Sequence, residues 1–447
     1  MKREFTTILL TVLMAGTLAS PFYVAPAKAS GTVYIHSDGS IAPVEAPIST
    51  SDKVTYTLTG DISDSIVVER SNIIIDGASH AVVGDGTGNG FKLTNISNVT
   101  IKNTNIENFT YGVYIESASS IVVQENNITA NSYDGIGLFY SSSTTIAGNT
   151  ITWNEYDGIE NYHSSFCNVS GNYIAANGWF GIEIYDSSNN NIIENRVADN
   201  YNGIELFYSL DNSIFHNDFV NHTLQVSTVS SVAVWDNGYP SGGNYWSDYT
   251  GVDSNGDGIG DTPYPIDENN QDRYPLMKPW TNIAILDISP SKTVVGKGFT
   301  LHIYVSVQNQ GWNTETFNIT AYANATIITT LMNIALTSRN SLTLTFTWNT
   351  SGFVKGNYTI WAYATPVSGE TDTADNTCED GWVLVSCVGD VNGDKKTTIA
   401  DIVLVIGKFG TTPASPDWNP NCDIDGNDKV TIGDIVITIG NFGNIWT

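Results

Sequence analysis

Short apolar stretches separated by glycine- and asparagine-rich turns dominate residues 30–245. Inside each stretch apolar and polar residues alternate, which is the period of a β-strand. A glycine-led motif recurs at intervals of 22 or 23 residues, and asparagines in the turns keep the same step. A repeat this short cannot bury an apolar face alone, so the pattern predicts coils stacked as a right-handed parallel β-helix. The motif reads GFKL, GVYI, GIGL, GIEN, GIEI and GIEL and begins at Gly90, Gly112, Gly135, Gly158, Gly181 and Gly203.

The repeat resembles those of NosD-like and pectate-lyase-like β-helix proteins, and the stretch SNIIIDGASHAVVGDG resembles their first coils. The resemblance implies a β-helix domain, which we place at residues 30–245. The NosD name also suggests copper. The six histidines form no cluster in the sequence, however, and no methionine-rich tract is present, so the residues give copper no support.

Outward-facing positions of the coils carry candidate chemistry. In three successive coils a glutamate lies two residues after the glycine. In four successive coils an aromatic residue lies four residues after the glycine. Coils about 4.8 Å apart would make the glutamates repel one another unless they splay into water, hold a cation or keep a raised pKa. Aromatic rings suit sugars, and paired carboxylates suit glycoside hydrolysis. The simpler interpretation is a solvated face whose aromatic residues cover coil edges. The catalytic candidates are Asp134, Asp157, Glu160, Glu183, Glu205 and His163, and the carbohydrate-binding candidates are Phe139, Tyr162, Tyr185 and Phe207.

A calcium loop is predicted within residues 246–281, where the repeat stops. The stretch GVDSNGDGIGD places oxygen ligands at alternating positions, as in calcium loops. Its twelfth position is Tyr264 instead of a carboxylate, and the prolines that follow forbid a helix, so it is not an EF-hand. We expect calcium to brace the cap that closes the end of the β-helix. The predicted ligands are Asp253, Asn255, Asp257, Asp261 and the carbonyl of Ile259.

Alternating strands eight to twelve residues apart characterise residues 282–387 and predict an immunoglobulin-like sandwich. Patterns such as VSVQNQG and ETDTADNT resemble the CARDB family. No catalytic constellation is visible in this part of the sequence, so a spacer or adhesion role is expected.

Two nearly identical units, offset by 33 residues, fill residues 388–447: DVNGDKKTTIADIVLVIGKFG and DIDGNDKVTIGDIVITIGNFG. Each is a calcium-type loop followed by a helical pattern. The pair resembles a type I dockerin, which implies calcium and a cohesin domain on another protein. Lys395 and Asp428 stand where EF-hands prefer glycine, so the specificity of the partner stays open. The predicted ligands are Asp390, Asn392, Asp394, Lys396, Thr398 and Asp401 in the first loop, and Asp423, Asp425, Asn427, Lys429, Thr431 and Asp434 in the second.

The compartment follows from the ends of the chain and its charge. Residues 1–29 read as a secretory signal peptide, no later stretch is apolar enough to span a bilayer, and ten N-x-[ST] sequons predict glycosylation. A net charge of −28 argues against nucleic acid and favours divalent cations and neutral or cationic ligands. Of the four cysteines, Cys387 and Cys422 are the preferred disulfide, with Cys378 and Cys387 as the alternative.

These features predict a mainly β, secreted, modular surface protein: a β-helix, a sandwich and a small α-helical module with two calcium loops. It would bind polysaccharide or surface ligands and dock to a cohesin. The alternative is a carbohydrate-active enzyme, a lyase or glycosidase acting on uronic-acid-type polymers.

Overall fold

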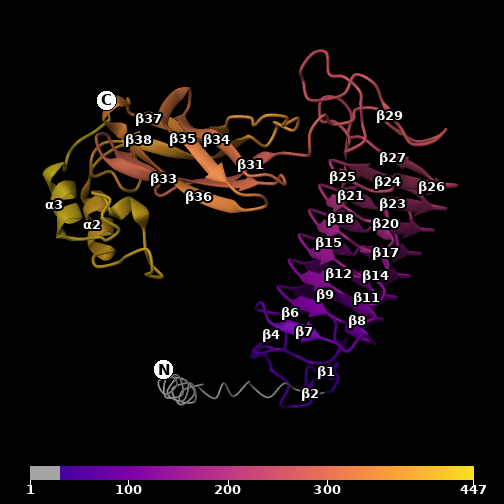
Figure 1. The fold of residues 1–447 in the computed structure, drawn as a ribbon. Coiled ribbons are helices and arrows are strands. Elements are labelled where there is room, and N and C mark those ends of the chain that lie inside the picture. Colours follow the sequence, from indigo (N-terminus) through magenta and orange to yellow (C-terminus); the bar gives the residue numbers. More distant parts are fainter. Residues whose placement is uncertain (1–30, 447) are drawn as a thin grey trace, which may run out of the picture. The chain divides into compact units, whose positions relative to one another are not determined.

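The computed structural model describes residues 31–446 (Figure 1), so the predicted signal peptide lies outside the described residues. The fold is mainly β, as predicted, with a parallel β-helix followed by immunoglobulin-like sheets and two short α-helices. The chain divides into two compact units. The first ends at Ser164 and includes Asn177–Trp179, and the second comprises Ser165–Ala176 and everything from Phe180 onward.

The first unit consists of β-helix coils that contribute strands to three sheets. Neighbouring coils pair in parallel, while β2 and β3 pair antiparallel at the edges. The first sheet contains β2 (Ile41–Ala42), β1 (Val33–Ile35), β5 (Ile66–Val68), β8 (Asn89–Thr94), β11 (Tyr111–Glu116), β14 (Ile136–Phe139) and β17 (Ile159–Tyr162). The second contains β3 (Ile48–Ser49), β4 (Thr55–Leu58), β6 (Ile73–Asp76), β9 (Ser97–Lys102), β12 (Ser119–Gln124) and β15 (Thr145–Ala147). The third contains β7 (Ala81–Val83), β10 (Asn105–Glu107), β13 (Asn127–Thr129) and β16 (Thr150–Thr152).

The repeat gives each coil an apolar interior and hydrogen-bonded corners. Ile136 and Ile159 pair in register and are fully buried. At one corner the side-chain amide of Asn131 donates to Asn154 Oδ1 at 2.8 Å, while Asn131 Oδ1 accepts the backbone N–H of Phe109. Glycine is required at Gly135, because a Cβ there would lie 2.5 Å from the Ile151 side chain. The glycine and asparagine ladders of the sequence are therefore structural.

The second unit continues the same architecture and then changes it. Its coil strands are β18 (Asn168–Ser170), β19 (Tyr173–Ala175), β20 (Phe180–Tyr185), β21 (Asn191–Ile193), β22 (Arg196–Ala198), β23 (Asn202–Phe207), β24 (Leu210–Phe215), β25 (Asp218–Val220), β26 (Leu224–Val229), β27 (Val232–Val234) and β28 (Tyr245–Trp246). A cap follows, with a small antiparallel pair, β29 (Tyr264–Pro265) and β30 (Gln271–Asp272). Trp246 fills the end of the coil stack, since its ring stacks on Phe219 at 4.7 Å and on Tyr264 at 4.5 Å.

Two sheets form the sandwich around a core that includes Phe346 and Trp348. One sheet has the order β31 (Ile283–Pro290), β33 (Thr300–Asn309), β36 (Ser341–Asn349). The other has the order β32 (Val294–Gly296), β38 (Thr377–Ser386), β37 (Gly356–Ala364), β34 (Glu315–Ala323), β35 (Thr326–Leu336), and the 3₁₀ helix η1 (Thr350–Gly352) follows β36.

The C-terminal module contains α2 (Ile399–Gly407) and α3 (Ile432–Gly440), with the 3₁₀ helix η2 (Pro420–Cys422) between them. Each α-helix begins with a capping box, in which a threonine and an aspartate three residues later satisfy the first N–H groups. Within residues 31–446, no helix has the length and apolar character needed to cross a membrane.

Candidate functional site

Three of the predicted catalytic carboxyls come together in the first unit, beside the beginnings of β14 and β17. Asp134 is fully buried, and its Oδ1 atom accepts the backbone N–H of Asp157 at 2.9 Å. Its Oδ2 atom meets no N–H or O–H donor. The Asp134 carboxyl is instead hydrogen-bonded to the Glu160 carboxyl, and a bond between two acids requires that one keep its proton.

The proton of this carboxyl pair, Asp134 and Glu160, belongs to Asp134. Burial, together with the negative charge of Asp157 and the contact with Glu160, raises the pKa of Asp134 to about 10. Burial also raises the pKa of Glu160, and the hydrogen bond from Asp134 opposes that rise. At neutral pH Asp134 is therefore neutral and can donate a hydrogen bond to Glu160.

Aromatic rings lie beside the carboxyl pair, of which Asp134 is buried and Glu160 is half-buried. The ring of Tyr111 lies 5.3 Å from those of Tyr114 and Tyr133 and 5.9 Å from that of Phe139. Burial raises the pKa of Tyr111, and negative charge on Glu160 adds to this rise. Gly137 lies opposite Glu160 in the register, and a Cβ there would come within 2.7 Å of the Phe139 ring. A side chain at this position would therefore displace the rings of Phe139 and Tyr111.

The other predicted residues of the first unit form an aromatic row. Phe139 and Tyr162 lie opposite each other in the register, with ring centroids 6.2 Å apart. His163 stacks on Tyr140 at 5.1 Å and meets Tyr162 edge-on at 4.3 Å. The predicted aromatic neighbours are therefore present, and His163 belongs to their row.

In the second unit, Glu183 and Glu205 occupy paired positions on β20 and β23, as the repeat predicted. Glu205 accepts the hydroxyl of Ser227 at 2.9 Å. Tyr185 and Phe207 stack with centroids 5.0 Å apart. The two glutamates thus point away from the interior beside an aromatic pair.

Sequence reasoning missed a second aromatic ladder, next to the carboxyl pair. The rings of Tyr133 and Tyr156 stack at 4.3 Å, and Trp179 stacks on Tyr156 at 6.1 Å. Tyr156 is 41% exposed and Trp179 is 54% exposed, so both rings reach the surface. The signal was an aromatic residue two positions before the glycine in four successive coils: Tyr133, Tyr156, Trp179 and Tyr201.

The three predicted calcium loops share one hydrogen-bond pattern. We call residues 253–261 the cap loop, residues 390–401 the first C-terminal loop and residues 423–434 the second C-terminal loop. In each, the carboxylate at position one accepts backbone N–H groups from positions four and six. These carboxylates are Asp253, Asp390 and Asp423. The pattern folds each loop around its first ligand.

The closing carboxylates are also equivalent. Asp401 and Asp434, at position twelve, accept N–H groups from positions two and three of their loops. In the cap loop Asp261 takes over this role, since it accepts the N–H of Ser254, at position two, at 3.0 Å. The hydroxyls of Thr398 and Thr431, predicted as ninth-position ligands, act as helix N-caps.

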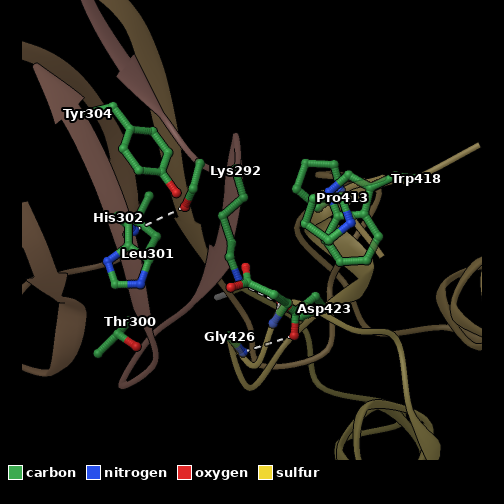
Figure 2. Close-up of a pocket in the computed structure, with 12 residues that line it drawn as sticks. Lys292, Thr300, Leu301, His302, Tyr304, Pro413, Trp418, Asp423 and Gly426 are labelled. Carbon is green, nitrogen blue, oxygen red and sulfur yellow. Dashed lines mark hydrogen bonds between the residues drawn. The ribbon is translucent and has the colours of Figure 1, made fainter. Parts of the chain in front are cut away.

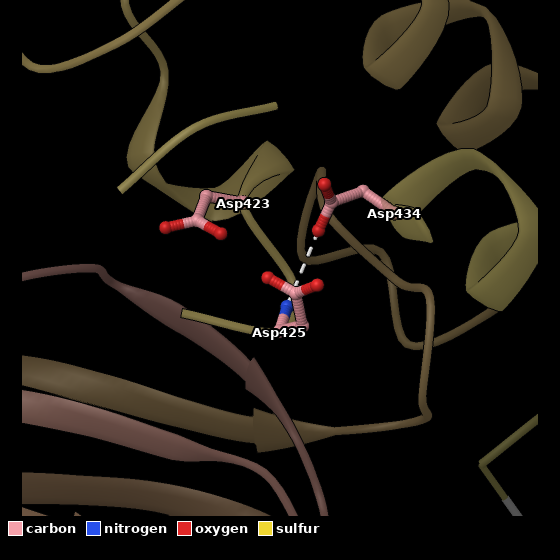
Figure 3. A group of neighbouring side chains, drawn as sticks. All are labelled: Asp423, Asp425 and Asp434. Carbon is pink, nitrogen blue, oxygen red and sulfur yellow. Dashed lines mark hydrogen bonds between the residues drawn. The ribbon is translucent and has the colours of Figure 1, made fainter. Parts of the chain in front are cut away.

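The second C-terminal loop brings three carboxylates together, as Figure 3 shows. Single oxygen atoms of Asp423, Asp425 and Asp434 lie within 4.8 Å of one another, the only such group found among the described residues. Carboxylate and carbonyl oxygens are the donors that calcium prefers, so the residues fit this ion.

The one group of metal-type side chains found among the described residues is made of carboxylates, whereas copper prefers imidazole and sulfur ligands. His216 is buried against Trp280 with ring centroids 3.7 Å apart, and burial lowers its pKa to about 4. His222 Nε2 lies 3.0 Å from the carbonyl of Val197. Each ring therefore has a local structural role.

Both helices of the C-terminal module leave an apolar face in water. The exposed fractions of these side chains lie between 53% and 65%, and the two helices match position by position. The matched pairs are Ile399 and Ile432, Val403 and Val436, and Ile406 and Ile439 within the helices, and Phe409 and Phe442 just after them.

Cys387 and Cys422, the preferred disulfide of the sequence, are both free thiols in the structure. Cys387 Sγ lies 3.4 Å from Lys355 Nζ. Cys422 is buried in the apolar core of the C-terminal module, beside Val405 and Val430. The two thiols thus occupy separate environments.

Comparisons with known proteins place the β-helix in a family context. Residues 48–251 match the family described as periplasmic copper-binding protein (NosD). The probable ABC transporter binding protein NosD of Stutzerimonas stutzeri is 41% identical over 88 residues, which is 20% of this chain and 19% of that protein. The chain therefore spans about a fifth of this relative's length.

Solved structures show likeness to the separate parts. The CARDB domain of a Pyrococcus furiosus protein is 23% identical and covers 24% of this chain and 94% of its own, with a TM-score of 0.21. The periplasmic alginate epimerase AlgG is 17% identical and covers 38% of this chain and 49% of its own, with a TM-score of 0.31. The A-module of the Azotobacter vinelandii mannuronan C-5 epimerase AlgE6 is 12% identical and covers 40% and 58%, with a TM-score of 0.31. Scores this low say nothing about activity. The sequence match and the parallel coils together show that residues 48–251 form a NosD-like domain.

Proposed function

We propose that the chain is a secreted, modular cell-surface protein. It binds polysaccharide or other surface ligands through its β-helix and docks, through its C-terminal module, to a cohesin-bearing partner. The observation that carries the docking role is the duplication of a calcium-type loop followed by a helix with an exposed apolar face. Matched apolar faces on two helices expose surface that a partner protein would cover favourably.

Calcium is the cofactor of this proposal. Asp423, Asp425 and Asp434 would hold it in the second C-terminal loop, with Asn427 and the carbonyl of Lys429. The equivalent residues of the first C-terminal loop are Asp390, Asn392, Asp394, the carbonyl of Lys396 and Asp401. A bound ion would neutralise the gathered carboxylates and fix each loop to the helix that follows.

The cap loop has a different role, because no helix follows it. Asp253, Asn255, Asp257 and Asp261 would hold calcium, with the carbonyl of Ile259. The ion would fasten a segment that covers the last coil, whose strands would otherwise be open at their end.

Docking is tested by binding of the full chain to a panel of immobilised type I cohesins, in calcium and in EDTA. We expect binding in calcium to at least one cohesin and its loss in EDTA. Replacement of Phe409 and Phe442 by aspartate should abolish binding. The matched control is Met332→Asp, which changes an equally exposed apolar residue of the sandwich. Failure of every cohesin to bind in calcium would disprove docking.

Polysaccharide binding is supported by the face that combines the carboxyl pair with the ladder of Tyr133, Tyr156 and Trp179. Aromatic side chains at the surface provide apolar contact for sugar rings, and the half-buried Glu160 beside them provides a hydrogen-bonding group for hydroxyls. The groups that shift the pKa values of the carboxyl pair include no basic side chain, so the face suits neutral glycans better than polyanions.

A carbohydrate-active enzyme, a lyase or glycosidase of uronic-acid-type polymers, is the second candidate function. The observation that favours it is the carboxyl pair, whose members lie in different environments, Asp134 buried and Glu160 half-buried, as acid–base catalysis by two carboxyls requires. Incubation of the full chain with pectin, alginate and neutral glucans tests it. Product formation that is lost in Glu160→Gln but retained in Glu155→Gln, an exposed neighbour, would establish the enzyme. No product from any polymer would rule it out.

A further inference from the structure

The second C-terminal loop is held by the sandwich. Lys292, between β31 and β32, is only 5% exposed, and its ammonium donates a hydrogen bond to the backbone carbonyl of Asp423 (Figure 2). Asp423 is the first residue of the loop, so a side chain of one module fixes the start of a calcium-type loop in another.

A second contact beside Lys292 joins the same two modules. The side-chain oxygen of Asn421 accepts the backbone N–H groups of Thr293 at 3.0 Å and of Val294 at 3.1 Å. Its amide nitrogen donates to the Thr293 hydroxyl at 3.2 Å. Because these groups are at the start of β32, the residues just before the loop are hydrogen-bonded to a strand end of the sandwich.

Apolar packing continues across this junction. Phe299, which precedes β33, packs against both the sandwich core and the core of the C-terminal module. A cavity of about 200 Å³ lies between the two modules. Figure 2 shows His302 and Tyr304 on one side of it, Trp418 and Pro413 on the other, and Lys292 between them.

The charge of Lys292 complements the loop that it contacts. The carboxylates of Asp423, Asp425, Asp428 and Asp434 all act on its ammonium. The protein thus places its own cation beside the oxygen atoms that suit calcium. The first C-terminal loop is held differently, since Asp390 accepts the hydroxyl of Ser386 at the end of β38. The two loops share six of their twelve residues and one hydrogen-bond pattern but differ in their attachment.

We infer that Lys292 is a positioning residue for the second C-terminal loop and links occupancy of that loop to the stability of the sandwich. The inference rests on the calcium binding proposed above. Lys292 and Asn421 hold the start of the loop in place, so an ion that orders the loop also steadies β32 and β33. By thermodynamic linkage, a ligand that binds only the ordered form of the loop also stabilises the elements whose order depends on that loop.

Hydrogen exchange of the full chain, read by mass spectrometry peptide by peptide, tests this linkage. In the wild type, saturating calcium should slow exchange in the second C-terminal loop and, by about tenfold or more, in β32 and β33. In Lys292→Met the loop should still respond to calcium, and β32 and β33 should not. Lys292→Arg keeps the cation and should restore part of the response. The matched control is Lys297→Met, which removes an exposed lysine nearby.

The outcomes separate the inference from the proposed function. If calcium protects the loop but leaves β32 and β33 unchanged in the wild type, the linkage is wrong and calcium binding stands. If calcium protects neither, both fail. If β32 and β33 respond equally in Lys292→Met and the wild type, Lys292 has no positioning role. Should Lys292→Met prove unfolded, Asn421→Ala tests the same junction, with the same expected loss of response.

Discussion

The carboxyl pair makes a prediction about stability and pH. In Asp134→Asn, the amide oxygen can still accept the Asp157 N–H and the amide nitrogen can donate to Glu160, so the substitution imitates a permanently protonated Asp134. Folding of the wild type holds a proton on Asp134 that the unfolded chain releases above its ordinary pKa of 3.8. The substitution removes this difference.

The magnitude follows from the two pKa values of Asp134. Its pKa rises on folding to about 10, so the wild type loses stability as pH rises between 3.8 and that value. The loss is about 1.4 kcal/mol for each pH unit, or about 4 kcal/mol between pH 5 and pH 8. Asp134→Asn should lack this slope and be the more stable protein at pH 8.

Scanning calorimetry of the full chain at several pH values between 5 and 8 measures the effect. A difference of about 4 kcal/mol corresponds to a separation of roughly 10 °C in the midpoint of a β-helix of this size. Glu155→Gln removes one exposed charge nearby and should follow the wild type. Parallel midpoints for Asp134→Asn and the wild type across this range would refute a neutral Asp134.

Three further predictions follow from the coils and the cap. Asn131→Ala leaves the Phe109 N–H without its acceptor and should lower the free energy of unfolding by about 3 kcal/mol in urea titration; an unchanged midpoint would contradict the corner ladder. Gly135→Ala forces a Cβ against the Ile151 side chain and should cost about 2 kcal/mol or more in the same assay; a neutral effect would show that the coil can shift. Asp261→Ala should reduce bound calcium by one ion in native mass spectrometry; an unchanged count would exclude Asp261 as a ligand.

The coil architecture could be predicted from sequence because its signal is periodic. The alternation of apolar and polar residues determines which side chains face the interior of the coils. A shift of one position would expose Ile136 and Ile159, which are buried. The pairing register of neighbouring coils therefore follows from the glycine spacing. The two C-terminal helices could be predicted in the same way, because their apolar positions recur in both units. Each additional copy of a sequence repeat is further evidence for the same local structure.

The chemistry of the β-helix face could not be predicted in this way. Asp134 and Glu160 interact beside packed rings that leave no room for a side chain at Gly137, and no interval in the sequence encodes that contact. Cys387 and Cys422 each precede a loop in the sequence, yet packing separates them. Lys292 is far from Asp423 along the chain, so its hydrogen bond depends on how the two modules pack. Contacts of this kind arise from tertiary packing, which the local pattern of apolar and polar residues does not predict.

The central claim is that oxygen-lined loops take up calcium and thereby order the cap and the docking module. Native mass spectrometry of the full chain, depleted with EDTA and returned to calcium, tests it most directly. We expect three calcium ions, of which two disappear when Asp401 and Asp434 are both replaced by alanine, and no copper uptake under the same conditions. A chain that binds no calcium, or that binds copper in its place, would contradict the account.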